Sequence, residues 1–185
     1  MPAIVSSIEI NQKPEEAVLH ELNGSDHAWL DVLGRQVVDL GAYVGDTAIY
    51  FSKRGARHVY AYESRFDVTE VAKKLVKKYG CEESITLYCD FIDSSKFNKL
   101  VKEHQIEDAA LKVDIEGGER EVILNASSDT LKRFSVMHIE CHYGYLDIQE
   151  RLENEGFEVT HTTPIYTWRR AERPMIRCDL YARRM

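Results

Sequence analysis

The sequence predicts an α/β fold: a doubly wound, mostly parallel sheet with helices on both faces and an antiparallel C-terminal hairpin strand. From Gln36 onward, short β-branched runs alternate with amphipathic helical patterns, which is typical of parallel strands joined by crossover helices. The last two strand-like runs have no helix between them, so they are expected to pair as an antiparallel hairpin. The predicted strands are 37–40, 58–62, 84–88, 109–115, 134–141, 157–163 and 176–182.

Helical patterns separate the strands of this core. The clearest is 67–79, where apolar residues recur at helical spacing and Gly80 ends the pattern. Asp67 is expected to cap this helix, with Glu70 three residues further on. The other helices of the core are predicted at 46–54, 95–104, 119–126 and 145–155.

A short helical segment precedes the core. A helix is predicted at 14–22, with proline at its start, and a further turn at 28–33. We expect this N-terminal extension, 1–35, to pack on the edge of the sheet or to cover the functional site. Together with the core, 36–185, it forms one predicted domain, since 185 residues suffice for a single hydrophobic core.

Composition narrows the classes of function. The chain has 31 acidic and 24 basic side chains and a formal net charge of −7, which disfavours a nucleic-acid-binding protein without excluding a local basic patch. Its 4 cysteines form no close pairs, so neither a zinc site nor a disulfide framework is predicted. The sequence shows no membrane span and no signal peptide pattern, so we expect a cytoplasmic protein.

The first candidate motif is the segment 39–47, Asp-Leu-Gly-Ala-Tyr-Val-Gly-Asp-Thr, at a strand–loop–helix junction. Glycines at positions 41 and 45 allow a tight turn and a close approach to a ligand, and the helix that follows presents unpaired N–H groups. The dinucleotide pattern GxGxxG is absent. A plain strand-to-helix turn is the alternative interpretation of this motif alone.

Acidic residues follow the next two strands. Glu63 ends the second strand, 22 residues after Gly41, where doubly wound folds place a carboxylate that accepts hydrogen bonds from ribose hydroxyls. Asp90 and Phe91 follow the third strand, where a carboxylate can accept from an adenine amine and a ring can cover its face. Ordinary surface acids are the alternative at both places.

Four further polar residues would converge on one pocket if the fourth and fifth strands are neighbours in the sheet. Asp114 and Glu116 lie two residues apart at the end of the fourth strand, and Glu140 and His142 lie two apart at the end of the fifth. A histidine beside carboxylates can accept a proton from a hydroxyl substrate. The same cluster could bind a hard or borderline cation, or serve only to cap a helix and pair charges at the surface.

An arginine-rich loop lies between the last two strands. Arg169, Arg170, Arg173 and Arg177 surround Trp168. Such a run usually forms a solvated turn, although contact with an anionic substrate is conceivable.

These motifs resemble the S-adenosylmethionine-dependent class I methyltransferases, and more narrowly the FkbM family. The matching stretches are VVDLGAYVGDTAIYFSKRGARHVYAYES, KVDIEGGEREVI and HIECH followed by a helix and GFEV. The resemblance implies a Rossmann-like, seven-stranded sheet with the last strand antiparallel. It also implies an O-methyltransferase that acts on hydroxyls of sugars or other small molecules.

The resemblance assigns roles to the motif residues. The loop 39–47 would hold the methionine part of the cofactor, Glu63 the ribose, and Asp90 with Phe91 the adenine, while Asp114 would stand near the sulfonium and the acceptor. The predicted cofactor-binding residues are Asp39, Gly41, Gly45, Asp46, Thr47, Glu63, Asp90 and Phe91. The predicted catalytic residues are Asp114, His142 and Glu140, and no metal ligands are assigned.

Methyl transfer from S-adenosylmethionine to a small-molecule hydroxyl is therefore the function we expect, with neither nucleic acid nor membrane as a partner. Two alternatives keep the same cofactor: an RNA methyltransferase, and a non-catalytic S-adenosylmethionine-binding protein. A nicotinamide-dependent oxidoreductase fits less well, because the dinucleotide glycine pattern is missing.

Overall fold

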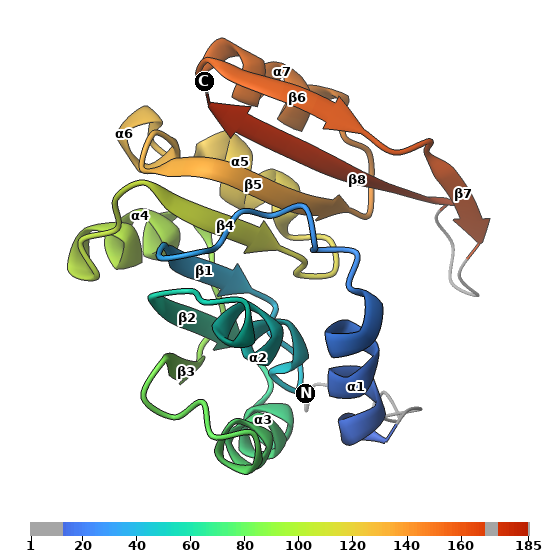
Figure 1. The fold of residues 1–185 in the computed structure, drawn as a ribbon. Coiled ribbons are helices and arrows are strands. Elements are labelled where there is room, and N and C mark those ends of the chain that lie inside the picture. Colours follow the sequence, from blue (N-terminus) through green and yellow to red (C-terminus); the bar gives the residue numbers. More distant parts are fainter. Residues whose placement is uncertain (1–12, 169–173, 185) are drawn as a thin grey trace, which may run out of the picture.

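The computed structural model describes residues 13–168 and 174–184. The described residues form eight strands, and the main sheet has the order β3-β2-β1-β4-β5-β8-β6 (Figure 1). β1 to β5 run parallel, with β1 and β4 side by side at the centre. The strands are β1 (Gln36–Leu40), β2 (His58–Glu63), β3 (Ile85–Cys89), β4 (Ala109–Val113), β5 (Phe134–Cys141), β6 (Phe157–His161), β7 (Ile165–Trp168) and β8 (Pro174–Arg184).

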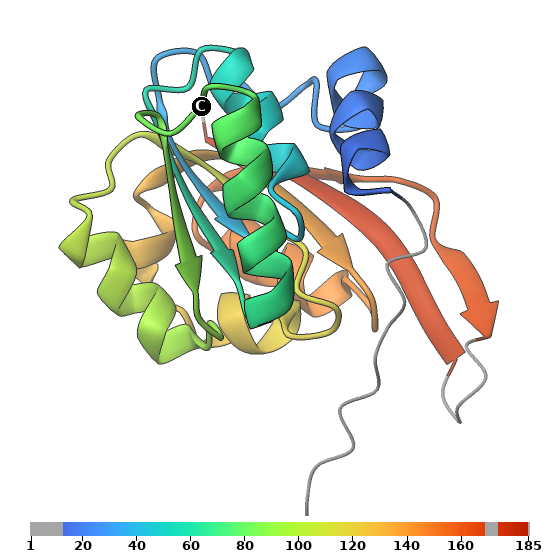
Figure 2. The same cartoon turned by 90° about the horizontal axis from the view of Figure 1, so that it is seen from below.

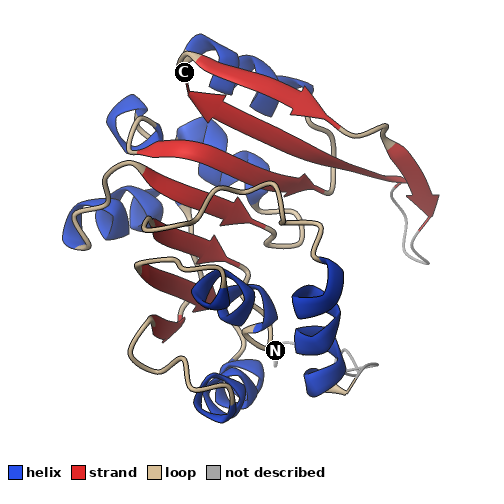
Figure 3. Ribbon diagram, viewed as in Figure 1, coloured by secondary structure: helices blue, strands red, loops and turns tan. Residues whose placement is uncertain are grey.

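Helices cover both faces of the sheet, as predicted (Figure 3). One hydrophobic cluster joins the sheet to the first three helices, and a second joins it to the other four, so the sheet is buried on each side. Strands β1 and β4 are accordingly buried along their whole length. The helices are α1 (Pro14–Gly24), α2 (Asp46–Lys53), α3 (Phe66–Lys78), α4 (Ser94–Glu103), α5 (Glu119–Asn125), α6 (Ser128–Leu131) and α7 (Leu146–Asn154).

The C-terminal end confirms the predicted antiparallel hairpin and adds one feature. β6 and β8 pair antiparallel, from Phe157 opposite Arg184 to His161 opposite Leu180. β8 also pairs antiparallel with β5, so the antiparallel strand lies between β5 and β6 rather than at the edge. The short strand β7, which the sequence did not predict, pairs with the beginning of β8 and extends beyond the main sheet (Figure 2).

The N-terminal segment packs on a face of the sheet. Helix α1 lies beside α2 (Figure 2), and the turn that follows α1 reaches β5 and β8. There the ring of His27 lies 4.7 Å from that of His138, and the ring of Trp29 lies 4.4 Å from that of Tyr181. This segment therefore covers the middle of the sheet and not its edge.

Three local details differ from the sequence prediction. Helix α3 begins two residues earlier than a cap at Asp67 implies, because its N-cap is Arg65, so Asp67 lies inside the first turn. Helix α6 was not predicted. Strand β4 ends at Val113, two residues earlier than predicted, so Asp114 lies in the loop that follows.

No helix within the described part of the chain is long and apolar enough to cross a membrane.

Candidate functional site

The loop after β1 lies directly against the loop after β4. Gly41 has a φ of +83°, and a Cβ atom there would lie 1.6 Å from the carbonyl oxygen of Asp114. Gly45 has a φ of +81°, and its Cβ position would lie 3.3 Å from Cβ of Ala72 in α3. Both glycines therefore occur where the backbone turns and where the space for a side chain is small or absent.

A buried ion pair between Asp39 and Lys112 stabilises the loop after β1. Asp39 has no exposed surface; its Oδ2 accepts a 2.6 Å hydrogen bond from Thr47, and its Oδ1 lies 3.2 Å from Nζ of Lys112. Lys112 also donates a 2.7 Å hydrogen bond to the carbonyl oxygen of Gly41. Burial alone would lower the pKa of Lys112, but Asp39 and other carboxylates outweigh it and raise the pKa above its usual value. Lys112 therefore stays charged and connects β1, β4 and the glycine loop.

Asp46 begins helix α2 at the mouth of the same loop. Burial, with a smaller contribution from the nearby Asp39 carboxylate, raises the pKa of Asp46 to about 6, although Lys112 acts in the opposite direction. A cationic ligand beside a buried carboxyl group with a raised pKa would stabilise its ionised form, because opposite charges attract.

Glu63 lies at the end of β2, and its side chain is nearly buried. Its Oε1 accepts a 2.8 Å hydrogen bond from the backbone N–H of Arg65 and a longer one from Ser64. Within the described residues these contacts all go to Oε1, so Oε2 can accept a hydrogen bond from a ligand. Asp90, which follows β3, donates its backbone N–H to the carbonyl of Glu63 at 3.0 Å.

The side chains of Asp90 and Phe91 point to the molecular surface. Asp90 pairs with Lys96 of α4, and Phe91 is 67% exposed. A ring this exposed can cover one face of a bound planar group without first leaving a packed core. Asp90 thus lies beside Glu63 through its backbone, while its carboxylate is held in an ion pair with Lys96.

The polar residues after β4 and β5 do come together. His142 is 4% exposed, and its Nε2 faces three carboxylates, those of Asp114, Glu116 and Glu140. The predicted reason was partly wrong: Asp114 and Glu116 lie in a loop, with Glu116 at a φ of +56°, and do not share a face of an extended strand. Their convergence follows from the pairing of β4 with β5 as parallel neighbours, which was the other condition of the prediction.

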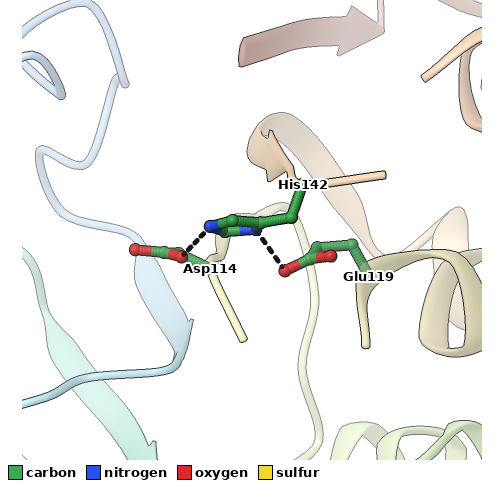
Figure 4. A group of neighbouring side chains, drawn as sticks. All are labelled: Asp114, Glu119 and His142. Atoms are coloured by element: carbon green, nitrogen blue, oxygen red, sulfur yellow. Dashed lines mark hydrogen bonds and ion pairs between the residues drawn. The ribbon is translucent and has the colours of Figure 1, made fainter. Parts of the chain in front are cut away.

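Glu119 is the most constrained acid of this cluster, although its motif did not mark it as a site residue. Its carboxylate is 2% exposed, and its Oε1 accepts hydrogen bonds from Nδ1 of His142 and from the backbone N–H groups of Ile115 and Gly117, at 3.0, 3.1 and 3.0 Å. Figure 4 shows the His142 imidazole between the carboxylates of Glu119 and Asp114. The sequence signal that could have pointed to Glu119 is an acid three residues beyond Glu116, at the first position of helix α5.

Electrostatics in the cluster favour a charged imidazole. Burial lowers the pKa of His142, but its hydrogen bond to Glu119 and the charges of the surrounding carboxylates raise it above its usual value. Burial, followed by the charge of Asp114, raises the pKa of Glu140, and Arg177 opposes this through a 2.6 Å contact between its Nε and Oε1 of Glu140. Arg177 is the one arginine of the predicted basic loop that the structure describes; the other three, like much of that loop, lie outside the described residues.

A groove lies beside the cluster, between the loop after β5 and the C-terminal hairpin. It has a volume of about 400 Å³. Its walls are mostly apolar or aromatic, and Arg120, which pairs with Asp147, lies at one side. The other lining residues are Gly144, Tyr145, Leu146, Pro164, Tyr166 and Ile176. Arg120 and Gly144 follow Glu119 and His142 closely in the sequence, so the groove is lined by the same two chain segments that carry part of the acidic cluster.

Several solved structures with the same fold are named as methyltransferases. A SAM-dependent O-methyltransferase from Thermotoga maritima aligns with a TM-score of 0.56 at 16% identity, over 94% of this chain and 66% of that one. An rRNA methylase from Streptococcus thermophilus aligns with a TM-score of 0.57 at 15% identity, over 95% of this chain and 99% of that one. A precorrin-6y C5,15-methyltransferase from Geobacter metallireducens aligns with a TM-score of 0.55 at 16% identity, over 98% of this chain and 94% of that one.

These similarities define the class of fold: a Rossmann-like α/β sheet, mostly parallel with antiparallel C-terminal strands, of the kind found in S-adenosylmethionine-dependent methyltransferases. No protein-family model matches the chain, and no protein of curated function matches it in sequence. Membership of the FkbM family therefore stays a prediction.

Proposed function

We propose that this protein is an S-adenosylmethionine-dependent methyltransferase that methylates a hydroxyl group of a small molecule. The observation that carries the proposal is the contact between the Gly41 backbone and the Asp114 carbonyl. This contact joins the loop that would hold the cofactor to a cluster that can hold a reacting hydroxyl. A cofactor bound along the loop would thus have its reactive end beside that cluster.

The residues along the carboxyl ends of β1, β2 and β3 fit this cofactor. Its sulfonium and amino groups carry positive charge, and Asp46 offers a carboxyl whose pKa a cation would lower. Oε2 of Glu63 would accept hydrogen bonds from the ribose. Phe91, with Asp90, would border the adenine. Asp39 and Thr47 would act indirectly, by holding the glycine loop in place.

When bound, S-adenosylmethionine supplies an electrophilic methyl group. The protein's own contribution would be to align the acceptor oxygen with that methyl, because orientation provides much of the rate enhancement in such transfers. Asp114, Glu140 and His142 would orient the hydroxyl, and a carboxylate of the cluster or the neutral form of His142 would receive its proton. The negative charge of this cluster would also favour a cationic sulfonium nearby.

Two observations favour a small acceptor. The groove of about 400 Å³ beside the cluster is of the size of small-molecule sites. The formal net charge of −7 disfavours an RNA substrate, since RNA binding depends largely on cationic contacts with phosphates. The FkbM family and a cytoplasmic location remain predictions that accompany this proposal.

Calorimetry with S-adenosylmethionine and with S-adenosylhomocysteine is the first test. We expect both to bind, and Glu63→Gln to weaken binding more than Glu70→Gln, which changes an exposed acid of α3 paired only with Lys73. The proposal would be refuted if neither compound binds.

The acceptor class can then be tested with methyl-labelled S-adenosylmethionine and fractionated cell extract. We expect label in a small-molecule fraction. Label in RNA, together with tRNA binding that falls steeply with salt, would instead identify an RNA methyltransferase.

A further inference from the structure

The loop after β1 and the end of β2 are joined through their backbones. The N–H groups of Gly41 and Ala42 both donate 2.9 Å hydrogen bonds to the carbonyl oxygen of Tyr62, the residue before Glu63. The two chain segments that would hold the methionine part and the ribose of the cofactor are therefore fixed against each other within the protein itself.

Tyr43 occupies the middle of this loop in a backbone conformation that favours glycine. Its φ is +44°, in the left-handed region, where a bulky side chain is rare. Its side chain is partly buried and packs against the hydrophobic cluster that includes residues of α2 and α3. Residues held in such conformations are concentrated at ligand clamps and active sites, because the surrounding structure has to stabilise them. The conformation of Tyr43 therefore calls for a functional explanation.

The ring of Tyr43 faces the guanidinium of Arg65. Cζ of Arg65 lies 5.8 Å from the centre of the ring, within the range of a cation–π interaction. Burial raises the pKa of Tyr43, and the charge of Arg65 lowers it. The carboxylates of Asp46 and Glu63 raise the same pKa, so Tyr43 lies within electrostatic range of two predicted cofactor-binding residues.

Arg65 also holds the carboxylate of Glu63. Its backbone N–H donates a 2.8 Å hydrogen bond to Oε1 of Glu63, and Nε of its side chain lies 3.7 Å from the same oxygen. Because the Glu63 side chain is nearly buried, these contacts set its orientation more than water does. Both contacts go to Oε1, which leaves Oε2 for a ligand.

We propose that Arg65 and Tyr43 are positioning residues for the cofactor. The Tyr43 ring keeps the guanidinium beside Glu63, and the guanidinium holds Oε1 of Glu63, so that Oε2 is presented to the ribose hydroxyls. A guanidinium suits this role, because it can stack on an aromatic ring while its N–H groups face a carboxylate. Arg65 acts through Glu63 and does not itself contact the cofactor. This inference rests on the proposed function and adds two residues to it.

Calorimetry with S-adenosylhomocysteine measures the role of Arg65. Arg65→Met removes the guanidinium, and we expect the dissociation constant to rise about fivefold, as for the loss of one partly exposed ion pair. Arg65→Lys keeps a positive charge and should lose less affinity. Arg183→Met is the matched control, because Arg183 also pairs with a glutamate, Glu158, but belongs to the C-terminal strand β8. This control should bind like the unchanged protein.

A double-mutant cycle distinguishes positioning from a purely structural role. In the Glu63→Gln background, Arg65→Met should change the dissociation constant by less than about twofold, because the carboxylate through which Arg65 acts is already gone. An equal loss of affinity in both backgrounds would overturn the proposal, since Arg65 would then act on the cofactor directly or through the fold. Unchanged affinity of the single variant Arg65→Met would overturn it as well.

Two substitutions test the ring of Tyr43. Tyr43→Phe keeps an aromatic face and should bind like the unchanged protein, whereas Tyr43→Leu removes it and should weaken binding about 2- to 5-fold. Both variants have a Cβ atom, so both keep the backbone strain of this position. Circular dichroism would show that each variant is folded. Equal affinities of Tyr43→Phe and Tyr43→Leu would overturn the role of the ring.

Failure of this proposal is separable from failure of the proposed function. If the unchanged protein binds neither S-adenosylmethionine nor S-adenosylhomocysteine, the proposed function fails and this inference fails with it. If the unchanged protein binds them but Arg65→Met shows no coupling to Glu63→Gln, only the positioning role fails.

Discussion

Glu119 and His142 form a 3.0 Å hydrogen bond across 23 residues of sequence, and both side chains are almost completely buried. The bond joins the start of α5 to the end of β5. Glu119 in addition accepts hydrogen bonds from two backbone N–H groups in the loop after β4. A single carboxylate thus holds together the two chain segments that form the acidic cluster.

Replacement of Glu119 should therefore strongly destabilise the protein. Glu119→Ala leaves a buried imidazole and two buried N–H groups without their acceptor, so we expect the free energy of unfolding to fall by about 3–5 kcal/mol. Glu119→Gln retains an acceptor oxygen and should have a smaller effect. Urea unfolding measures both. Glu70→Ala, at an exposed ion pair, should change stability by less than about 1 kcal/mol; comparable losses in Glu119→Ala and Glu70→Ala would contradict the structure.

Gly41 should not tolerate a side chain. In Gly41→Ala the new Cβ would lie 1.6 Å from the Asp114 carbonyl oxygen, so the two loops must separate. Gly80→Ala is the matched control, because Gly80 also has a positive φ, +64°, but nothing lies within 4 Å of its Cβ position. We expect Gly80→Ala to destabilise by about 1–2 kcal/mol through backbone strain alone. Gly41→Ala should destabilise by clearly more in thermal melting and abolish S-adenosylmethionine binding.

Lys112 should be essential for the fold because its partner cannot reach water. Lys112→Met leaves Asp39 charged, buried and unpaired, which should lower the free energy of unfolding by about 3–5 kcal/mol. The double variant Asp39→Asn with Lys112→Met removes both charges and should recover part of that loss. Chemical denaturation of the unchanged protein, Lys112→Met and the double variant measures how much of the loss the second substitution recovers. A double variant no more stable than Lys112→Met would show that the loss comes from packing and not from charge.

The sequence predicted well the features that depend on periodicity and on strand ends. Alternating strand and helix patterns were sufficient for a parallel sheet, and in such a sheet the residues after neighbouring strands meet at one edge. The meeting of Asp114 with His142 was predictable for this reason. The pairing of β6 with β8 was predictable because no helix separates them.

Features that depend on register or on loop conformation were not predictable. Asp39 and Lys112 are direct partners in the pairing of β1 with β4, but nothing in either strand alone indicates that register. Glu119 reaches back to His142 because Glu116 and Gly117 both have positive φ angles, +56° and +110°, which turn the chain toward β5. Hairpin pairing also does not indicate which neighbour β8 takes on its other side, and in the structure that neighbour is β5.

Asp46 should make both stability and cofactor binding depend on pH. Its pKa in the folded protein is raised to about 6 from 3.8, so the stability present at low pH is lost as the pH rises from about 4 through 6. The full loss corresponds to about 3 kcal/mol, and Asp46→Asn should not show it. Thermal melting of both proteins from pH 4 to pH 8 measures this difference.

The same titration gives a sharper test of the proposed cofactor. A cationic ligand beside Asp46 binds best to its ionised form, so the affinity for S-adenosylmethionine should rise about tenfold from pH 5 to pH 7.5. The rise should disappear in Asp46→Asn, because an amide does not titrate in this range. Calorimetry at the two pH values checks it. An equal rise in the variant would place the cofactor's positive charge away from the start of α2, and would remove Asp46 from the set of cofactor-binding residues.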